Sequence, residues 1–349
     1  MRHAGMRPAH GSAYRSLQPS RRTLYYGCVF IDALFTQAAR RMPHACGLIS
    51  RTMHIHPPHR STIFLEDAEV LAHERFEGQQ FILKLKAPKC ARHAKAGSFV
   101  HLTCDESLPM RRPLSIMRAN AERETIEVLY KIVGHGLELL SRKRPGDRIN
   151  CLGPIGNGFV PHAERPLALL VGGGVGIPPM IFLAEELRER SDADWKPLVL
   201  MGSEIPFPFR AKPSTILVPG MPDATIACMP MLDEWGIPSR LASFAGFPGC
   251  YEGYVTDLAA AWLQSLDQQT LSKVEMFACG PTVMLKAAAN VAKRFNVPCQ
   301  VSLEEFMACA VGGCAGCAVR VETPQGPAMK RVCVDGPVFD AAQVFLGSE

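Results

Sequence analysis

The sequence contains no uninterrupted apolar run of the roughly 18 residues that a membrane-spanning helix needs. A strong charge of either sign is also missing, because 38 basic and 33 acidic residues leave a formal charge of only +5. The first 52 residues carry eight arginines and one acid, so the rest of the chain is slightly acidic. These absences argue against a membrane span and give the body of the chain no nucleic-acid-binding character. A hydrophobic content of 47% over 349 residues predicts a soluble protein of two or three domains.

A disulfide framework is lacking as well. The chain has thirteen cysteines, an odd number, and most lie singly in apolar stretches, as Cys151, Cys228 and Cys299 do. We expect these to be free buried thiols in a protein of the reducing cytoplasm.

Residues 1–60 show no recognisable fold pattern. Up to residue 52 the only acid is Asp32, and proline, serine and histidine interrupt short apolar pieces. Such a segment is typical of a basic targeting sequence. It would look the same if translation began at Met53. We expect a poorly ordered or spurious extension without a chemical role.

Residues 61–161 are expected to form a small antiparallel barrel or sandwich. Short alternating strands recur at a spacing of roughly 10–20 residues. The strand-like segments are TIFLEDAEVLAH, QQFILKLKAP, GSFVHLTC, RPLSIMRA and TIEVLYKIVG. The segment RPGDRINCLGPIGNGF is expected to close this domain with glycine and proline turns.

The pattern changes after residue 162. The stretch PLALLVGGGVGIPPMIFLAEELRER has the features of a buried strand, a glycine turn and an amphipathic helix. The later stretch VEMFACGPTVMLKAAANVAKRF repeats this unit. Buried strands that alternate with helices predict a doubly wound parallel α/β domain over residues 162–299.

The glycine turn of this domain is a candidate phosphate site. Gly172–Gly174 and Gly176 lie where a strand gives way to a helix, so that backbone N–H groups can approach an anion. Pro178 and Pro179 suit the first helical turn. The G-x-G-x-x-G fingerprint is absent, because Ile177 occupies the third glycine position. A tight turn without a ligand is therefore the alternative.

Residues 300–349 form a third, small module that contains four cysteines in the spacing C-x4-C-x2-C-x15-C: Cys309, Cys314, Cys317 and Cys333. Three ligands in a tight loop with one distant partner match the plant-type [2Fe–2S] arrangement. Three glycines in the loop leave room for backbone N–H groups to face the cluster sulfurs. A four-cysteine zinc site is the alternative, but it normally has two C-x2-C pairs, and only one is present.

The order of the motifs resembles the ferredoxin-reductase superfamily. In RRPLSIM, Arg112 and Ser115 lie three residues apart, a spacing that points them to opposite faces of a regular strand. This motif and then LYKIVGHG, GGGVGIPPM and ACGP follow one another over residues 61–298. The resemblance implies that the barrel holds FAD and that the α/β domain holds NAD(P)H.

With the segments SLEEFMACAVGGCAGCAV, KRVCVDGPVFDA and GPIGNGF, the chain is similar to the electron-transfer subunits of NAD-linked (class 1B) dihydroorotate dehydrogenase. Ser115 and Cys279 are then the expected catalytic residues, and the four cysteines of the third module are the expected cluster ligands. The cofactor contacts implied by the resemblance are Arg112, Pro113, Leu114, Ser115, Leu129, Tyr130, Lys131, Gly136 and Leu137 for FAD, and Gly172, Gly173, Gly174, Gly176, Cys279, Gly280 and Pro281 for NAD.

Two positions depart from the family pattern. Ala310 follows the first cluster cysteine where the family usually has glycine, which would cost about 1 kcal/mol if the position needs a positive φ. Leu137 replaces a threonine whose hydroxyl would bond phosphate. Neither change removes a cluster ligand.

The resemblance implies a relay in the order NAD(H), FAD, [2Fe–2S] cluster and partner chain. The expected partner is an FMN-containing dihydroorotate dehydrogenase subunit in a heterotetramer, with electrons passing from dihydroorotate to NAD⁺. The chain has no obvious site for orotate. Two other functions are open: an electron-transfer subunit of a hydrogenase, sulfite reductase or transhydrogenase, and a redox-sensing or zinc-stabilised nucleotide-binding protein without turnover.

Overall fold

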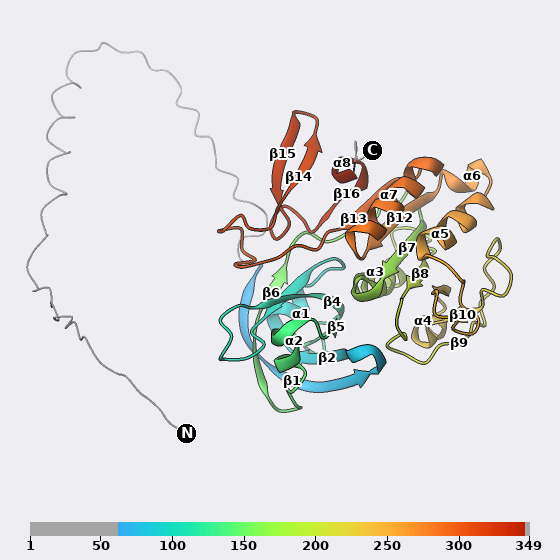
Figure 1. Ribbon diagram of the computed structural model, residues 1–349. Coiled ribbons are helices and arrows are strands. Elements are labelled where there is room, and N and C mark those ends of the chain that lie inside the picture. The colour runs from blue at the N-terminus through green and yellow to red at the C-terminus, as the bar shows by residue number, and fades with distance from the viewer. Residues whose placement is uncertain (1–61, 346–349) are drawn as a thin grey trace, which may run out of the picture. The chain divides into compact units, whose positions relative to one another are not determined.

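A computed structural model describes residues 62–345 (Figure 1). The extension expected over residues 1–60 lies outside these described residues. Among the described residues, no helix is long and apolar enough to cross a membrane.

The first part of the described chain is a closed six-stranded antiparallel barrel, which confirms the predicted β-domain. Its strands follow the order β1-β2-β5-β4-β3-β6 around the barrel. Inward-facing aliphatic side chains such as Leu83, Leu85 and Ile126 fill its interior and are fully buried. The elements of the barrel are β1 (Phe64–Phe76), β2 (Gln80–Lys86), β3 (Phe99–Leu102), β4 (Arg112–Asn120), β5 (Thr125–Lys131) and β6 (Arg148–Ile155), with the short helices α1 (Pro88–His93) and α2 (Gly134–Leu140) between strands.

Strand β6 adds to one expectation. The segment RPGDRINCLGPIGNGF was expected to close the domain with glycine and proline turns, and its middle residues, Arg148–Ile155, are the strand that closes the barrel against β1 and β3. Ile149 and Cys151 alternate with polar neighbours and are 2% and 1% exposed. That period of two is the pattern of a strand with one buried face. A turn at Pro145 and Gly146 precedes the strand.

The second part is a six-stranded sheet in the order β11-β8-β7-β12-β13-β16. All neighbouring pairs are parallel except β13 and β16, so the predicted doubly wound parallel sheet is confirmed with one antiparallel edge strand. Its elements are β7 (Leu167–Gly173), β8 (Leu198–Gly202), β11 (Ser239–Ala242), β12 (Val274–Cys279) and β13 (Cys299–Ser302), with α3 (Ile177–Glu189), α4 (Pro230–Glu234), α5 (Val255–Gln264), α6 (Gln268–Leu271), α7 (Thr282–Phe295) and the small ladder β9 (Lys212–Pro213) and β10 (Ala227–Cys228).

Helices cover both faces of this sheet (Figure 1). On β7, Ala168 and Leu170 belong to the hydrophobic cluster that includes α3, whereas Leu169 and Val171 belong to the cluster that includes α5 and α7. The continuous apolar run in β7 is therefore explained by burial on both faces.

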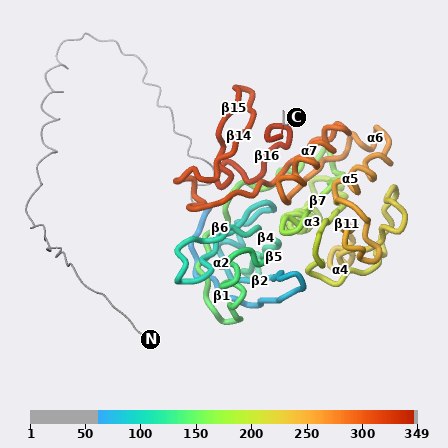
Figure 2. The backbone as a smooth tube through the Cα atoms, in the orientation of Figure 1, coloured from blue at the N-terminus to red at the C-terminus, as the bar shows by residue number. Residues whose placement is uncertain are grey.

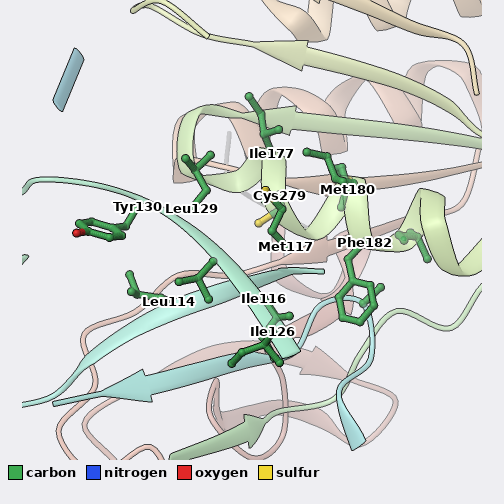
Figure 3. Packing of buried hydrophobic residues seen from close by; sticks show 14 of the residues in the cluster. Leu114, Ile116, Met117, Ile126, Leu129, Tyr130, Ile177, Met180, Phe182 and Cys279 are labelled. Carbon is green, nitrogen blue, oxygen red and sulfur yellow. The ribbon is translucent and has the colours of Figure 1, made fainter. Parts of the chain in front are cut away.

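Helix α3 also packs against the barrel. Figure 3 shows Ile116 and Met117 of β4 near Met180 and Phe182 of α3, and these four residues belong to one buried cluster. Arg118 of β4 forms an ion pair with Glu185 of α3. Its guanidinium also lies 4.9 Å from the ring centroid of Trp235. A shared apolar core and an ion pair thus hold the barrel against the α/β sheet.

Glu186 of α3 lies in this junction and gives a testable pH dependence. Its carboxylate accepts a 2.9 Å hydrogen bond from the Ala96 N–H of the barrel. Burial raises its pKa from 4.5 to about 7 despite that bond. Ionisation is thus harder in the folded protein than in the unfolded chain, so stability falls as pH rises from about 4.5 to 7.

We expect Glu186→Gln, which keeps an acceptor oxygen for Ala96, to stabilise the protein by about 1 kcal/mol at pH 8 and less at pH 5. Thermal melts followed by circular dichroism from pH 5 to 8 measure this difference. The exposed neighbour Glu189, replaced by Gln, is the matched control. Parallel melting curves for the wild type and Glu186→Gln at every pH would contradict the assignment.

The C-terminal module completes the fold. It contains a hairpin of β14 (Ala318–Thr323) and β15 (Gly326–Arg331), then β16 (Val338–Asp340) and α8 (Ala341–Phe345). β16 pairs with β13, so the module extends the α/β sheet by one strand. Figure 2 shows the module beside β6 of the barrel, and a third buried cluster joins Phe99 and Ile155 of the barrel to Cys317 and Cys333. The module therefore contacts both larger parts, while the domain boundaries remain a prediction.

Candidate functional site

The RPLS motif forms the first four residues of strand β4, with Arg112 at the start and Ser115 at the end of the motif. Ser115 pairs with Phe99 of β3. The Arg112 guanidinium covers the start of α2, where a Cβ placed on Gly136 would lie 2.9 Å from Arg112 Nε. Gly136 is therefore needed for the arginine to lie this close to the helix. Within residues 62–345 the Ser115 hydroxyl has no hydrogen-bond partner, which leaves it available to a ligand.

The expected FAD contacts on β5 divide into core and surface positions. Tyr130 is 1% exposed, and its hydroxyl lies 2.8 Å from Nε2 of His73. Its ring stacks on Phe81, with 5.4 Å between the ring centroids. Leu129 is also buried and belongs to the cluster between the barrel and α3 (Figure 3). Tyr130 therefore offers a ligand only its backbone, whereas the half-buried Lys131 side chain remains accessible.

The glycine turn and the C-G-P motif meet at the carboxyl edge of the sheet. β7 ends at Gly173, Gly174–Gly176 forms a tight turn, and α3 begins at Ile177. A Cβ on Gly176 would lie 2.3 Å from the carbonyl oxygen of Cys279. Ligands of open α/β sheets bind outside the carboxyl ends of the strands. The two predicted nucleotide motifs are therefore adjacent, at the edge where such a ligand binds.

Cys279 ends β12 and is fully buried. Burial and, secondarily, the nearby Glu304 carboxylate raise the pKa of its thiol far above the usual value. This shift favours the protonated thiol over the thiolate. Its position at the strand end is suited to shaping the floor of a nucleotide site.

The four cysteines of the third module form two pairs. The Cys314 N–H donates to Cys309 Sγ over 3.4 Å, and the Gly316 N–H donates to Cys314 Sγ over 3.4 Å. On the other side, Cys317 Sγ and Cys333 Sγ lie 3.3 Å apart as free thiols. The loop thus turns backbone N–H groups toward sulfur, as the glycine content predicts.

A side-chain contact holds the distant cysteine segment against the loop. Arg331 Nη1 donates to the Gly312 carbonyl over 3.0 Å. Within the segment itself, the Arg331 backbone N–H donates to Asp335 Oδ2 over 2.7 Å. From the barrel side, the Asn157 side-chain amide donates to the Asp335 carbonyl over 3.0 Å. The barrel turn GPIGNGF therefore seats the segment that follows Cys333, and its glycines permit the close approach.

The donor set fits an iron–sulfur cluster. Burial raises the pKa of the Cys309 thiol, but hydrogen bonds from the backbone of Val311 and Cys314 outweigh it and bring the pKa to about 7. This favours the thiolate that a metal ligand must be. Among residues 62–345, no three His, Cys, Asp or Glu side chains converge on one point as ligands of a single ion. Two cysteine pairs suit the two irons of a [2Fe–2S] cluster, each of which takes two protein ligands.

The positions that depart from the family pattern are both explained by the structure. Ala310 has φ +56°, so the conformation that favours glycine is present and the alanine is strained. Ala315, between the second and third cysteines, has φ +55° and carries the same strain. Leu137 lies half-buried on α2 and packs against the barrel core. Its apolar side chain therefore contributes to packing in place of a polar contact.

Two cavities lie away from the glycine turn and the C-G-P motif, although Asn157 and Gly158 of GPIGNGF line the smaller one. One of about 320 Å³ is lined by Glu275, Cys299 and Gln300, and one of about 640 Å³ by Arg165, Lys293 and Cys299. These residues precede or begin their strands, so both cavities lie at the amino edge of the sheet, opposite the glycine turn. They are not part of the nucleotide site.

Sequence reasoning missed three residues that shape the site: His101, Asn157 and Arg331. Asn157 and Arg331 lie within the quoted segments GPIGNGF and KRVCVDGPVFDA, but no spacing indicates which residues they contact. The only sequence signal was the pair of glycines around Asn157, which indicated a tight turn but not its partner.

The chain matches known proteins over about 80% of its length. Residues 304–345 match the iron–sulfur cluster binding domain of dihydroorotate dehydrogenase B. The electron transfer subunit of dihydroorotate dehydrogenase B (NAD⁺) from Geobacillus thermodenitrificans is 34% identical over 290 residues, which cover 80% of this chain and 98% of the relative. The subunit of the same name from Desulforamulus reducens is 31% identical over 280 residues, with 80% and 97% covered.

Solved structures agree with the fold. An NADH-dependent reduced ferredoxin-NADP oxidoreductase, studied for flavin-based electron bifurcation, superposes with a TM-score of 0.63 at 27% identity. The match covers 80% of this chain and 90% of that chain. The ferredoxin reductase of carbazole 1,9a-dioxygenase superposes with a TM-score of 0.52 at 20% identity, covers 68% of this chain and 67% of that one, and supports the fold alone.

Proposed function

The chain belongs to the family of electron transfer subunits of NAD⁺-linked dihydroorotate dehydrogenase B, and from this premise we propose that it relays electrons between NAD and a partner dehydrogenase through FAD and a [2Fe–2S] cluster. The observation that carries the proposal is the packing of the cysteine module on the face of the barrel that bears Ser115 of the RPLS motif. Phe99, paired with Ser115, lies in the same buried cluster as Cys317 and Cys333.

Each part of the chain has a separate task in this relay. Arg112 supplies the positive charge for the FAD pyrophosphate, and the Ser115 hydroxyl is available to the isoalloxazine ring. The glycine turn supplies backbone N–H groups for the NAD pyrophosphate. FAD supplies the exchange between hydride transfer and single-electron transfer. The protein holds the two sites together through the shared core of β4 and α3.

The cysteine loop also offers a surface to the partner. Phe306 is 93% exposed and Val311 is 49% exposed, and both lie within three residues of Cys309. Apolar side chains this exposed beside a redox centre suit a docking site. We assign this surface to the FMN-containing subunit that oxidises dihydroorotate, with electrons passing from it to NAD⁺.

Cofactor analysis tests the proposal directly. Anaerobically purified protein should contain one FAD, two irons and two acid-labile sulfides per chain, and should reduce a dye with NADH. One zinc without flavin would overturn the relay and support a zinc-stabilised nucleotide-binding protein. Mixing with a dihydroorotate-oxidising FMN subunit should couple dihydroorotate oxidation to NAD⁺ reduction.

The nucleotide preference gives a separate prediction. Glu204 follows the end of β8 and is exposed, so its carboxylate can accept bonds from a ribose hydroxyl and repel a 2′-phosphate. Lys212 lies 3.5 Å from Asp233 and is engaged there. We expect kcat/KM for NADH to exceed that for NADPH by at least about tenfold, equal to about 1.4 kcal/mol.

Glu204→Ser should reduce this ratio mainly by improving NADPH. The exposed Glu234 on α4, replaced by serine, is the control for a general loss of negative charge. Steady-state dye reduction with both nucleotides measures the ratio. Equal kcat/KM values in the wild type would reject the preference, and an unchanged ratio in Glu204→Ser would reject the residue.

A further inference from the structure

His101 lies between the predicted FAD motif and the cysteine loop. On β3 it pairs with Pro113 of β4, and its neighbour Phe99 pairs with Ser115. Directly paired residues of neighbouring strands share a face. His101 is therefore on the barrel face that carries Pro113 and Ser115 of the RPLS motif, and Phe99 on that face packs with the cluster cysteines.

The imidazole of His101 is buried without a partner. The residue is 1% exposed, and within the described chain neither Nδ1 nor Nε2 has a hydrogen bond. Backbone groups of Arg111 and Met307 lie close enough to affect its protonation, but neither meets the ring with hydrogen-bond geometry. Met307 belongs to the loop that leads to Cys309.

The ring is uncharged at physiological pH. Burial and the nearby Arg111 charge lower the pKa of His101 to about 4. A neutral imidazole has one N–H donor and one acceptor nitrogen. A buried donor and a buried acceptor that both lack a hydrogen-bond partner destabilise the folded protein. An apolar side chain of similar size at this position would not carry that penalty. A side chain that costs stability in this way is expected to gain its partner in another state of the protein.

We propose that His101 is a positioning residue whose imidazole hydrogen bonds to the Met307 backbone carbonyl when the iron–sulfur cluster is bound, and so holds the cysteine loop against the flavin-binding face of the barrel. The inference rests on the proposed function, because it needs a cluster in the loop. Its consequence is that the imidazole stabilises the cluster-loaded protein and destabilises, or leaves unchanged, the cluster-free protein.

Replacement by leucine tests both halves of this statement. In His101→Leu, the loaded protein should release its cluster to an iron chelator about fivefold faster than wild type, the factor that corresponds to one ordinary hydrogen bond. The electron paramagnetic resonance signal of the reduced cluster should change in shape. After the cluster has been removed, His101→Leu should melt at the same temperature as wild type or higher.

Amide variants and a second histidine provide the controls. His101→Asn and His101→Gln place an amide near the positions of Nδ1 and Nε2, and one of them should restore slow cluster release. His73 lies in the same barrel, but its ring nitrogens lie 2.8 Å from the Lys143 carbonyl and the Tyr130 hydroxyl. His73→Leu should therefore lower the melting temperature of the cluster-free protein and leave cluster release unchanged.

The outcomes separate this inference from the relay itself. Wild-type protein that binds no cluster would overturn both. A wild type with a cluster, together with equal release rates in wild type and His101→Leu, would overturn the role of His101 alone. A leucine variant that fails to fold, or that melts much lower without the cluster, would also overturn it, because the imidazole would then be needed in the cluster-free state.

Discussion

Replacing Cys314 with serine is expected to abolish electron transfer to the partner subunit while NADH-dependent dye reduction stays close to the wild-type rate. Cys314 is the exposed member of the Cys309 pair, and serine offers a hydroxyl that binds iron poorly. The cluster should therefore be lost or badly destabilised. The flavin and nucleotide motifs lie on other elements and share a core that does not include Cys314, so both sites should persist.

The measurement compares two activities of one preparation. Dye reduction reports the step from NADH to flavin, and partner-linked turnover reports the path through the cluster. Cys250→Ser replaces a half-buried cysteine outside the module and should retain both activities. Binding to the partner must be measured in parallel, because the Phe306 surface lies on the altered loop. Partner-linked turnover at the wild-type rate without a cluster, or loss of dye reduction with FAD still bound, would contradict the relay.

Much of the fold could be predicted because its signals are local. Strands with a buried and an exposed face have a period of two, as Ile149 and Cys151 show, and strands buried on both faces are continuously apolar, as β7 is. The cluster ligands could be predicted because three of the four lie within nine residues of one another. The glycines and prolines of RPGDRINCLGPIGNGF predicted turns but not strand β6, which occupies the middle of the segment.

The rest of the site depends on contacts between distant segments. The Asn157 side chain donates a hydrogen bond to the Asp335 carbonyl, and His101 faces Met307. Both pairs join segments that are far apart in the chain, and no sequence pattern predicts such a pair. Side-chain direction is a second limit. Tyr130 belongs to the motif LYK, but its side chain points into the barrel, because its hydroxyl bonds His73. A motif indicates which residues lie near a ligand, whereas packing decides which atoms reach it.

The second large effect is expected at Gly176, where the two nucleotide motifs touch. In Gly176→Ala, the new methyl group would lie 2.3 Å from the carbonyl oxygen of Cys279 and 2.5 Å from the Gly280 nitrogen. Both atoms are backbone atoms next to buried strands that pair in register, Gly172 with Cys279, so neither segment can move alone. We expect a loss of about 3 kcal/mol of stability from this overpacking.

We expect NADH-dependent activity to fall as well. To make room for the methyl group, the glycine turn must shift relative to the C-G-P motif, and a displacement near 1 Å in a positioned site can cost about 100-fold in rate. We expect kcat/KM for NADH in dye reduction to fall by about this factor, with FAD retained because its barrel motif is distant in sequence and lies on β4. Dye kinetics, FAD content and thermal melts measure the three quantities.

Gly173→Ala is the steric control for this prediction. Its methyl group would lie 2.4 Å from Met284 Sδ, which is the flexible end of a side chain and can rotate away. The stability loss should therefore be well below that of Gly176→Ala, although the two glycines lie in the same turn. If Gly176→Ala melted like wild type and kept its kcat/KM for NADH, the contact between the two motifs would not be what shapes the site. If Gly173→Ala lost as much stability, the effect would belong to the turn as a whole and not to the backbone contact with Cys279.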